Sequence, residues 1–74
     1  MEPELLLSKP FLWEGQNYLV HIYRDPLGHT RCSHMAKTAL GPDDVVVSDG
    51  SSVAEVLHKQ REILPLAILS RTIR

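Results

Sequence analysis

The sequence predicts a small α+β domain in which a four-stranded antiparallel β-meander is followed by one C-terminal helix. Turn residues divide positions 10–48 into short segments with alternating apolar side chains. Ser52 is followed three residues later by a glutamate, which is typical of a helix start. Beyond it, apolar residues recur at helical spacing. With 74 residues, the chain has room for a single domain spanning residues 1–74.

The composition is that of an ordinary folded domain and argues against several other classes. Hydrophobic residues make up 43% of the chain and charged residues 23%, so a mainly disordered chain is excluded. The net charge of -1 argues against bulk binding to nucleic acids or anionic membranes. The single cysteine, Cys32, cannot form an internal disulfide. A chain this short has a small hydrophobic core, and small domains are often stabilised further by disulfides, a metal or a partner chain. Because a disulfide is excluded, a metal or a partner chain remains.

The first two strands are predicted near residues 10–14 and 18–25, on either side of a glycine turn. Glycine takes the positive φ that a tight hairpin turn requires. With Gly15-Gln16 as the two-residue loop, Trp13 lies opposite Tyr18.

The third strand is predicted over residues 29–39 and the fourth over residues 44–48. Asp25-Pro26-Leu27-Gly28 fits a type I turn with a glycine bulge, which places Ile22 opposite Cys32. The β-branched run Val45-Val46-Val47 is typical of a buried strand.

This pairing assigns the side chains to two faces of the sheet. The more apolar face is expected to contact the helix, and it carries Phe11, Trp13, Val20, Ile22, Cys32, His34 and Ala36. The opposite face carries Leu12, Leu19, His21, Tyr23, Arg31, Ser33 and Met35. A slip of one residue in the second hairpin would exchange the two sets there.

The helix is expected to begin with Ser52 as its N-cap and Glu55 at the third helical position. Gln60 interrupts its apolar stripe. Pro65 leaves two alternatives, because proline removes a hydrogen bond inside a helix. Either the helix kinks and continues to about Ser70, or it ends near Glu62 and residues 66–73 form a fifth strand. We favour the kinked helix, since no glycine or asparagine precedes the proline and the stripe continues in register.

Potential metal ligands gather in the second hairpin, where His29, Cys32 and His34 lie within six residues and His21 lies on the neighbouring strand. Alternation along the strands places Cys32 and His34 on one face and the other two on the opposite face. Turn and helix-start chemistry explains the acidic side chains of Asp43, Asp44 and Asp49. We therefore expect no metal, no cofactor and no catalytic site.

An alternative function is a small nucleic-acid-binding or regulatory domain. Its phosphate contacts would come from the basic residues Arg24, Arg31, Lys37, Arg71 and Arg74. These residues show neither aromatic interleaving nor a nucleic-acid-binding motif.

Apolar residues in excess of one helix–sheet core predict an interaction surface. Leu66, Leu69 and Ile73 form a second helical stripe, while Leu19, Tyr23 and Met35 lie on the sheet face away from the helix. The leading expectation is a non-enzymatic interaction module that forms a homodimer. Alternatively, the N-terminal segment with Leu5–Leu7 folds back over one of these patches. The start of the sequence has no basic region, and the longest apolar stretch is too short for a membrane span, so we expect a cytoplasmic protein.

Overall fold

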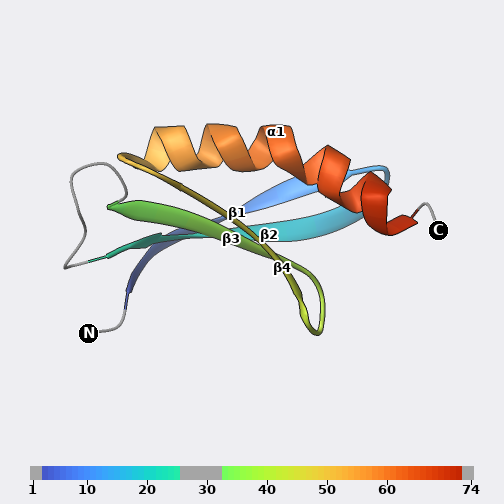
Figure 1. Ribbon diagram of the computed structural model, residues 1–74, viewed down its shortest axis with the longest axis horizontal. Coiled ribbons are helices and arrows are strands. Elements are labelled where there is room, and N and C mark those ends of the chain that lie inside the picture. The colour runs from blue at the N-terminus through green and yellow to red at the C-terminus, as the bar shows by residue number, and fades with distance from the viewer. Residues whose placement is uncertain (1–2, 26–32, 73–74) are drawn as a thin grey trace.

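A computed structural model describes residues 3–25 and 33–72, which form one sheet and one helix (Figure 1). The strands are β1 (Glu4–Trp13), β2 (Gln16–Arg24), β3 (His34–Gly41) and β4 (Asp44–Gly50), and the helix is α1 (Val53–Thr72). All neighbouring strands are antiparallel and follow the order β1-β2-β3-β4. The predicted α+β meander with a C-terminal helix is therefore confirmed.

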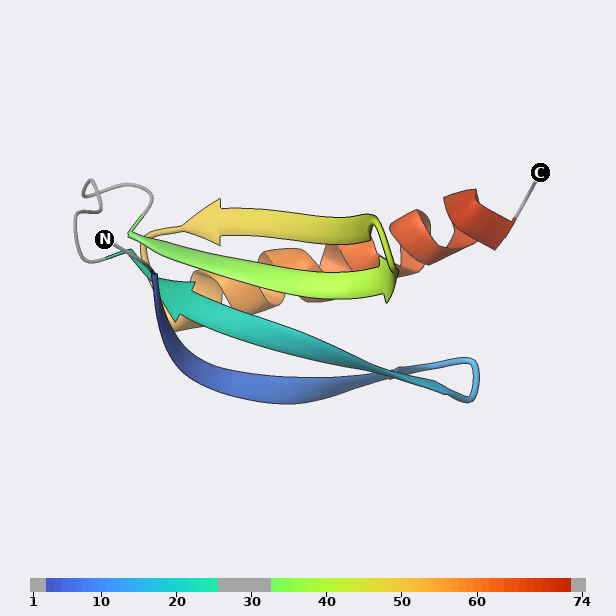
Figure 2. The ribbon, with the colours of Figure 1, turned by 90° about the horizontal axis from the view of Figure 1, so that it is seen from below.

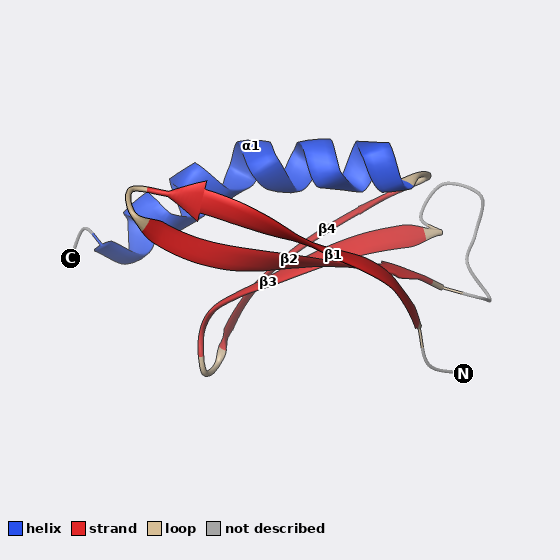
Figure 3. Cartoon of the chain, turned by 180° about the vertical axis from the view of Figure 1, so that it is seen from behind, coloured by secondary structure: helices blue, strands red, loops and turns tan. Residues whose placement is uncertain are grey.

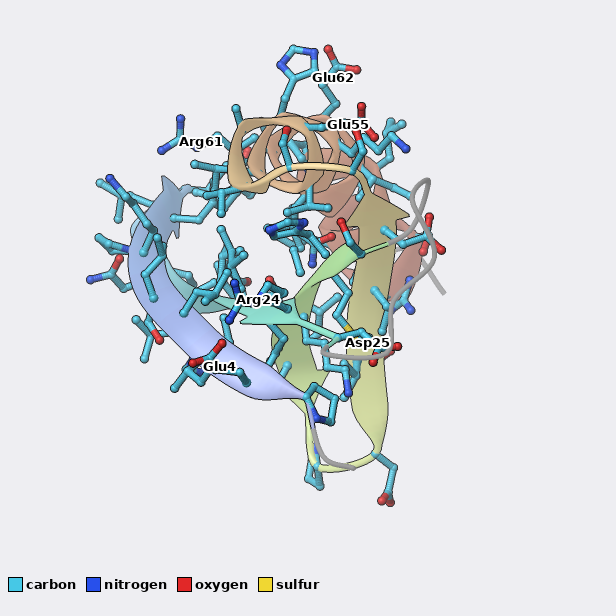
Figure 4. The ribbon with its side chains drawn as sticks, turned by 90° about the vertical axis from the view of Figure 1, so that its left-hand side faces the viewer. Glu4, Arg24, Asp25, Glu55, Arg61 and Glu62 are labelled. Atoms are coloured by element: carbon cyan, nitrogen blue, oxygen red, sulfur yellow. The ribbon has the colours of Figure 1, made fainter. Side chains whose placement is uncertain are left out.

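The helix covers only one face of the sheet, and it lies mainly over β4 and β3. Figure 2 shows that α1 crosses this face obliquely, and Figure 3 shows that no helix or strand of the described residues covers the opposite face. The sheet is curved, so that β1 rises on one side of α1 (Figure 4). The two edges of the sheet therefore have different surroundings.

The first hairpin turns at Glu14 and Gly15, which have φ angles of 48° and 80°. Two positive φ angles define a type I′ turn, whose twist matches that of the flanking strands. Trp13 consequently pairs with Gln16, so the predicted loop Gly15-Gln16 and the pairing of Trp13 with Tyr18 were wrong. The pairing differs by two positions, which leaves every side chain on its predicted face.

The first strand is longer than predicted, because it begins at Glu4 and pairs along the whole of β2. The segment with Leu5–Leu7 is therefore part of an edge strand and does not fold back over an apolar patch. The register shifts between Leu5 and Leu7, which marks an irregularity in the pairing of this strand.

The second pairing is displaced by four positions from the prediction, since Ile22 lies opposite Ala36 and not opposite Cys32. The third strand accordingly begins at His34 and ends at Gly41, later than the predicted 29–39. The predicted turn at Pro26–Gly28 lies outside the described residues. An even displacement again preserves the faces, so the predicted assignment is confirmed for the described residues.

The core lies between α1 and the face of the sheet that was predicted to contact it. Val20, Ile22 and Ala36 from the sheet are buried against Val56 and Leu64 of the helix. Val46 completes the buried set, and partly buried apolar side chains surround it: Leu7, Phe11, Leu40, Val53, Leu57, Ala67 and Ile68.

Gln60 lies in the middle of this apolar interface and is fully buried. Its Nε2 donates to the hydroxyl of Thr38 at 3.0 Å and to the carbonyl of Val46 at 2.8 Å. Its Oε1 accepts a hydrogen bond from the hydroxyl of Ser48 at 2.5 Å. The interruption of the apolar stripe is thus a side chain that hydrogen-bonds to both β3 and β4.

Two features define the course of the helix. At its start, the hydroxyl of Ser52 accepts a hydrogen bond from the N–H of Glu55 at 3.1 Å, which confirms the predicted N-cap. The carboxylate of Glu55 accepts from the N–H of Ser51 at 3.1 Å, one residue before the position a capping box would use. Further along, α1 continues through Pro65 to Thr72 and bends along its length (Figure 1). The continuous helix is confirmed and the alternative fifth strand was wrong.

Replacing Ser52 by alanine should lower the free energy of unfolding by about 1 kcal/mol, because the N–H of Glu55 loses its acceptor. In a domain of this size, that change lowers the melting temperature by several degrees, which thermal unfolding followed by circular dichroism measures. An unchanged melting temperature would show that this cap does not stabilise the folded state.

Replacing Gln60 by alanine should lower the free energy of unfolding by about 3 kcal/mol, since it leaves buried polar groups without partners and opens a cavity. Urea unfolding measures the loss. Arg61→Ala is the matched control at an exposed neighbouring position, where we expect a change within about 0.5 kcal/mol. Equal effects of the two substitutions would contradict a stabilising role for the buried amide.

Candidate interaction surfaces

The residues predicted to form an interface lie on two separate surfaces. Leu66 and Leu69 are exposed on α1, whereas Leu19 is exposed on the sheet face away from the helix. Tyr23 and Met35 are half-buried on that same sheet face. Ile73 lies outside the described residues. The described residues of the predicted set thus belong to two surfaces, one on the helix and one on the sheet.

The first surface is a groove between α1 and the free edge of β4, with a volume of about 470 Å³. We call it the edge groove. Ile63 and Leu66 are its exposed apolar helix residues, at 44% and 67% exposure. The full lining consists of Val47, Ser48, Asp49, Lys59, Glu62, Ile63 and Leu66. The prediction omitted Ile63, although its position three residues before Leu66 extends the same helical stripe.

The second surface is the uncovered face of the sheet, which we call the open face. Large exposed apolar side chains come from three of its strands: Leu5, Leu12, Leu19, Val45 and Val47. The prediction that Val45-Val46-Val47 forms a buried strand was wrong for two of these residues, because Val45 and Val47 are 51% and 52% exposed. A strand covered by a helix on one face buries alternate residues only, and within the valine run that residue is Val46.

Two pairs of side chains on the open face contact each other. The ammonium group of Lys37 lies 5.5 Å from the centre of the Tyr23 ring, a cation–π contact. The ring of His21 hydrogen-bonds to the hydroxyl of Ser8 at 2.7 Å.

The histidines considered as metal ligands do not converge. His34 hydrogen-bonds to the hydroxyl of Ser33 at 2.8 Å and lies on the face of the sheet opposite to His21. His29 and Cys32 lie outside the described residues. Within residues 3–25 and 33–72, no three His, Cys, Asp or Glu side chains are grouped closely enough to hold a metal ion.

The basic residues of the alternative function are dispersed, and those described already have contacts. Arg24 forms an ion pair with Glu4 at 2.5 Å, which Figure 4 labels at one end of the sheet. Arg71 binds Asp44 through two hydrogen bonds of 2.6 and 2.8 Å at the other end. Arg31 and Arg74 lie outside the described residues. The cations that are described do not form one patch.

The ion pair between Asp44 and Arg71 joins the last turns of α1 to the start of β4. The hydrogen bond from Arg71 lowers the pKa of Asp44, and the same bond raises the pKa of Arg71. Asp44 thus contacts the helix, a role that differs from the turn chemistry suggested by the sequence. Of the other two acidic residues, Asp49 accepts a hydrogen bond at its main-chain oxygen from Lys59 at 2.8 Å.

The ion pair predicts a dependence of stability on pH. The pKa of Asp44 is lower in the folded state than in the unfolded state. The ion pair therefore stabilises the fold fully above the pKa of an unfolded aspartate, about 3.9. This contribution is lost as the pH falls through the lowered pKa of the folded state. Asp44→Asn should therefore be less stable than the wild type at pH 7, and the difference should disappear at acidic pH. Urea midpoints measured between neutral pH and about pH 2 test this.

Asp43→Asn is the control for this series, because Arg71 binds the neighbouring carboxylate. We expect its stability to follow the wild type at each pH. A deficit of Asp44→Asn that stays constant down to the lowest pH would contradict the assignment.

None of the helices in the described part of the chain is long and apolar enough to cross a membrane. Comparison with known proteins found no matching family model, no similar curated protein and no similar solved structure.

Proposed function

We propose that this protein is a small, non-enzymatic protein–protein interaction module that forms a homodimer in the cytoplasm. The observation that carries this proposal is the gathering of large exposed apolar side chains on the edge groove and the open face. Apolar patches of this kind mark interaction sites in soluble domains, whereas single exposed apolar residues are ordinary.

A second copy of the chain is the partner that these surfaces support best. Burial of one large apolar side chain contributes roughly 1.5–3 kcal/mol, and two-fold symmetry counts each side chain twice. Several such residues offset an association cost of about 4–15 kcal/mol. A single helix on a four-stranded sheet also leaves this domain with a small core, which a dimer enlarges.

The polar side chains support a structural role better than a catalytic one. His21, His34 and Asp44 each hydrogen-bond to a neighbouring side chain, in pairs that do not share a site. The alternative of nucleic-acid binding has less support, because Arg24 and Arg71 form ion pairs at opposite ends of the sheet.

The proposal predicts the mass of the protein in solution. Sedimentation equilibrium should give a dimer at micromolar concentration, and the melting temperature should rise with protein concentration. Raising the salt concentration should leave an apolar dimer intact, whereas binding to an oligonucleotide would weaken steeply. A mass of one chain from micromolar to near-millimolar concentration would overturn the proposal.

A further inference from the structure

We infer that two copies join through antiparallel pairing of their β4 edges, which forms one eight-stranded sheet with both α1 helices side by side on the same face. This inference rests on the proposed homodimer and names the surface that makes it.

The two edges of the sheet differ in their capacity to pair. The edge strand β1 carries Lys9 and Pro10 near its middle, together with the register shift between Leu5 and Leu7. Proline, lysine and strand irregularities are the features by which edge strands avoid pairing with another chain. The segment 45–48 of β4 has no charge and no proline, and it pairs with β3 without a shift. The edge that is open to pairing is therefore β4.

Hydrogen bonds from α1 define which part of this edge is available. Lys59 donates to the main-chain oxygen of Asp49, and Arg71 binds the side chain of Asp44. The ends of β4 are thus engaged, and the middle remains. Gln60 donates to the carbonyl of Val46, but a carbonyl oxygen has a second lone pair and the amide donor leaves it usable.

The same contacts show that the apolar part of the edge groove lies beside the centre of β4. Lys59 lies at Asp49 and Arg71 at Asp44, so the helix runs antiparallel to the strand. The midpoint between Asp44 and Asp49 on the strand falls at Val46–Val47, and the midpoint between Lys59 and Arg71 on the helix falls at Pro65. Ile63 and Leu66 lie on either side of Pro65. A two-fold axis here places these two side chains of one copy against those of the other.

This arrangement has the anatomy of a protein interface. Its centre consists of Ile63 and Leu66, and its rim carries the charged residues Lys59 and Glu62 of the edge groove. An apolar centre surrounded by a polar rim is usual for specific interfaces.

The spacing of strands and helices also fits. Gln60 bonds to β3 and β4 together, so at this residue α1 lies over the line between these two strands. Strands are about 4.8 Å apart, so β4 lies half a strand spacing from the symmetry axis and the helix lies a further half spacing away. The two helix axes are therefore about 10 Å apart. Packed helices lie about 8–10 Å apart, so the two helices contact each other when the β4 strands pair.

A matched pair of substitutions tests which surface forms the dimer. Leu66→Glu places a charge in the edge groove, and Leu12→Glu places one on the open face at similar exposure, 67% against 70%. We expect Leu66→Glu to raise the dissociation constant at least about a hundredfold, because the dimer would bury unpaired charge. Leu12→Glu should leave it nearly unchanged. Circular dichroism establishes that both variants are folded.

Cysteine cross-linking tests the strand pairing directly, in a Cys32→Ser background. Side chains alternate along a strand, so a two-fold axis that keeps both helices on one face of the joined sheet passes through a residue position of β4. At the centre of the strand, that position is Val46 or Val47. With the axis at Val47, Val47→Cys alone forms a disulfide-linked dimer. With the axis at Val46, the link forms only in a mixture of Val45→Cys and Val47→Cys chains. Directly opposite residues are within disulfide distance, whereas diagonal ones are not.

The outcomes separate this inference from the proposed function. A cross-link in either experiment, absent from a Leu12→Cys control, supports β4 pairing even if the glutamate variant fails to fold. A wild-type dimer that forms neither cross-link and dissociates with Leu12→Glu overturns the edge inference and leaves the homodimer standing. A monomeric wild type overturns both.

Discussion

The hydrogen bonds of the buried Gln60 amide determine where α1 lies on the sheet, and both interaction surfaces depend on that position. Hydrophobic burial is non-directional, whereas a buried amide without hydrogen-bond partners is costly. Gln60 finds its partners, Thr38, Val46 and Ser48, only when α1 lies over β3 and β4. This placement sets Ile63 and Leu66 beside the edge of β4 and leaves β1 to the side.

Much of the fold follows from local patterns in the sequence. The N-cap at Ser52 and the stripe of apolar residues beyond it predict the helix, and its continuation through Pro65 follows from the unbroken register of that stripe. The core residues Val20, Ile22 and Ala36 were also predictable, although both hairpin registers were wrong. Side chains alternate between the two faces of a sheet with a period of two residues. An error of two or four residues in the pairing therefore leaves each side chain on its predicted face.

Other features depend on contacts between distant parts of the chain. The start of β1 at Glu4 follows from the length of β2, which offers a partner to residues that are not obviously β-forming. The exposure of Val45 and Val47 follows from the sheet face that α1 leaves uncovered, which the β-branched run does not reveal. Likewise, the sequence places Leu66 on a helical stripe, but only the packing of α1 shows that this residue lines a groove beside β4.

The strand order has a consequence for how the chain folds. Each strand pairs with its neighbour in sequence, so the sheet can form hairpin by hairpin with low contact order, which favours rapid folding. The helix follows all four strands, and Gln60 gains its partners only once β3 and β4 are paired. A sheet that forms before the helix docks leaves the core side chains Val20 and Val46 exposed to water. The lysine and proline of β1 protect one edge of this sheet, whereas the edge of β4 stays open to pairing both before and after α1 docks.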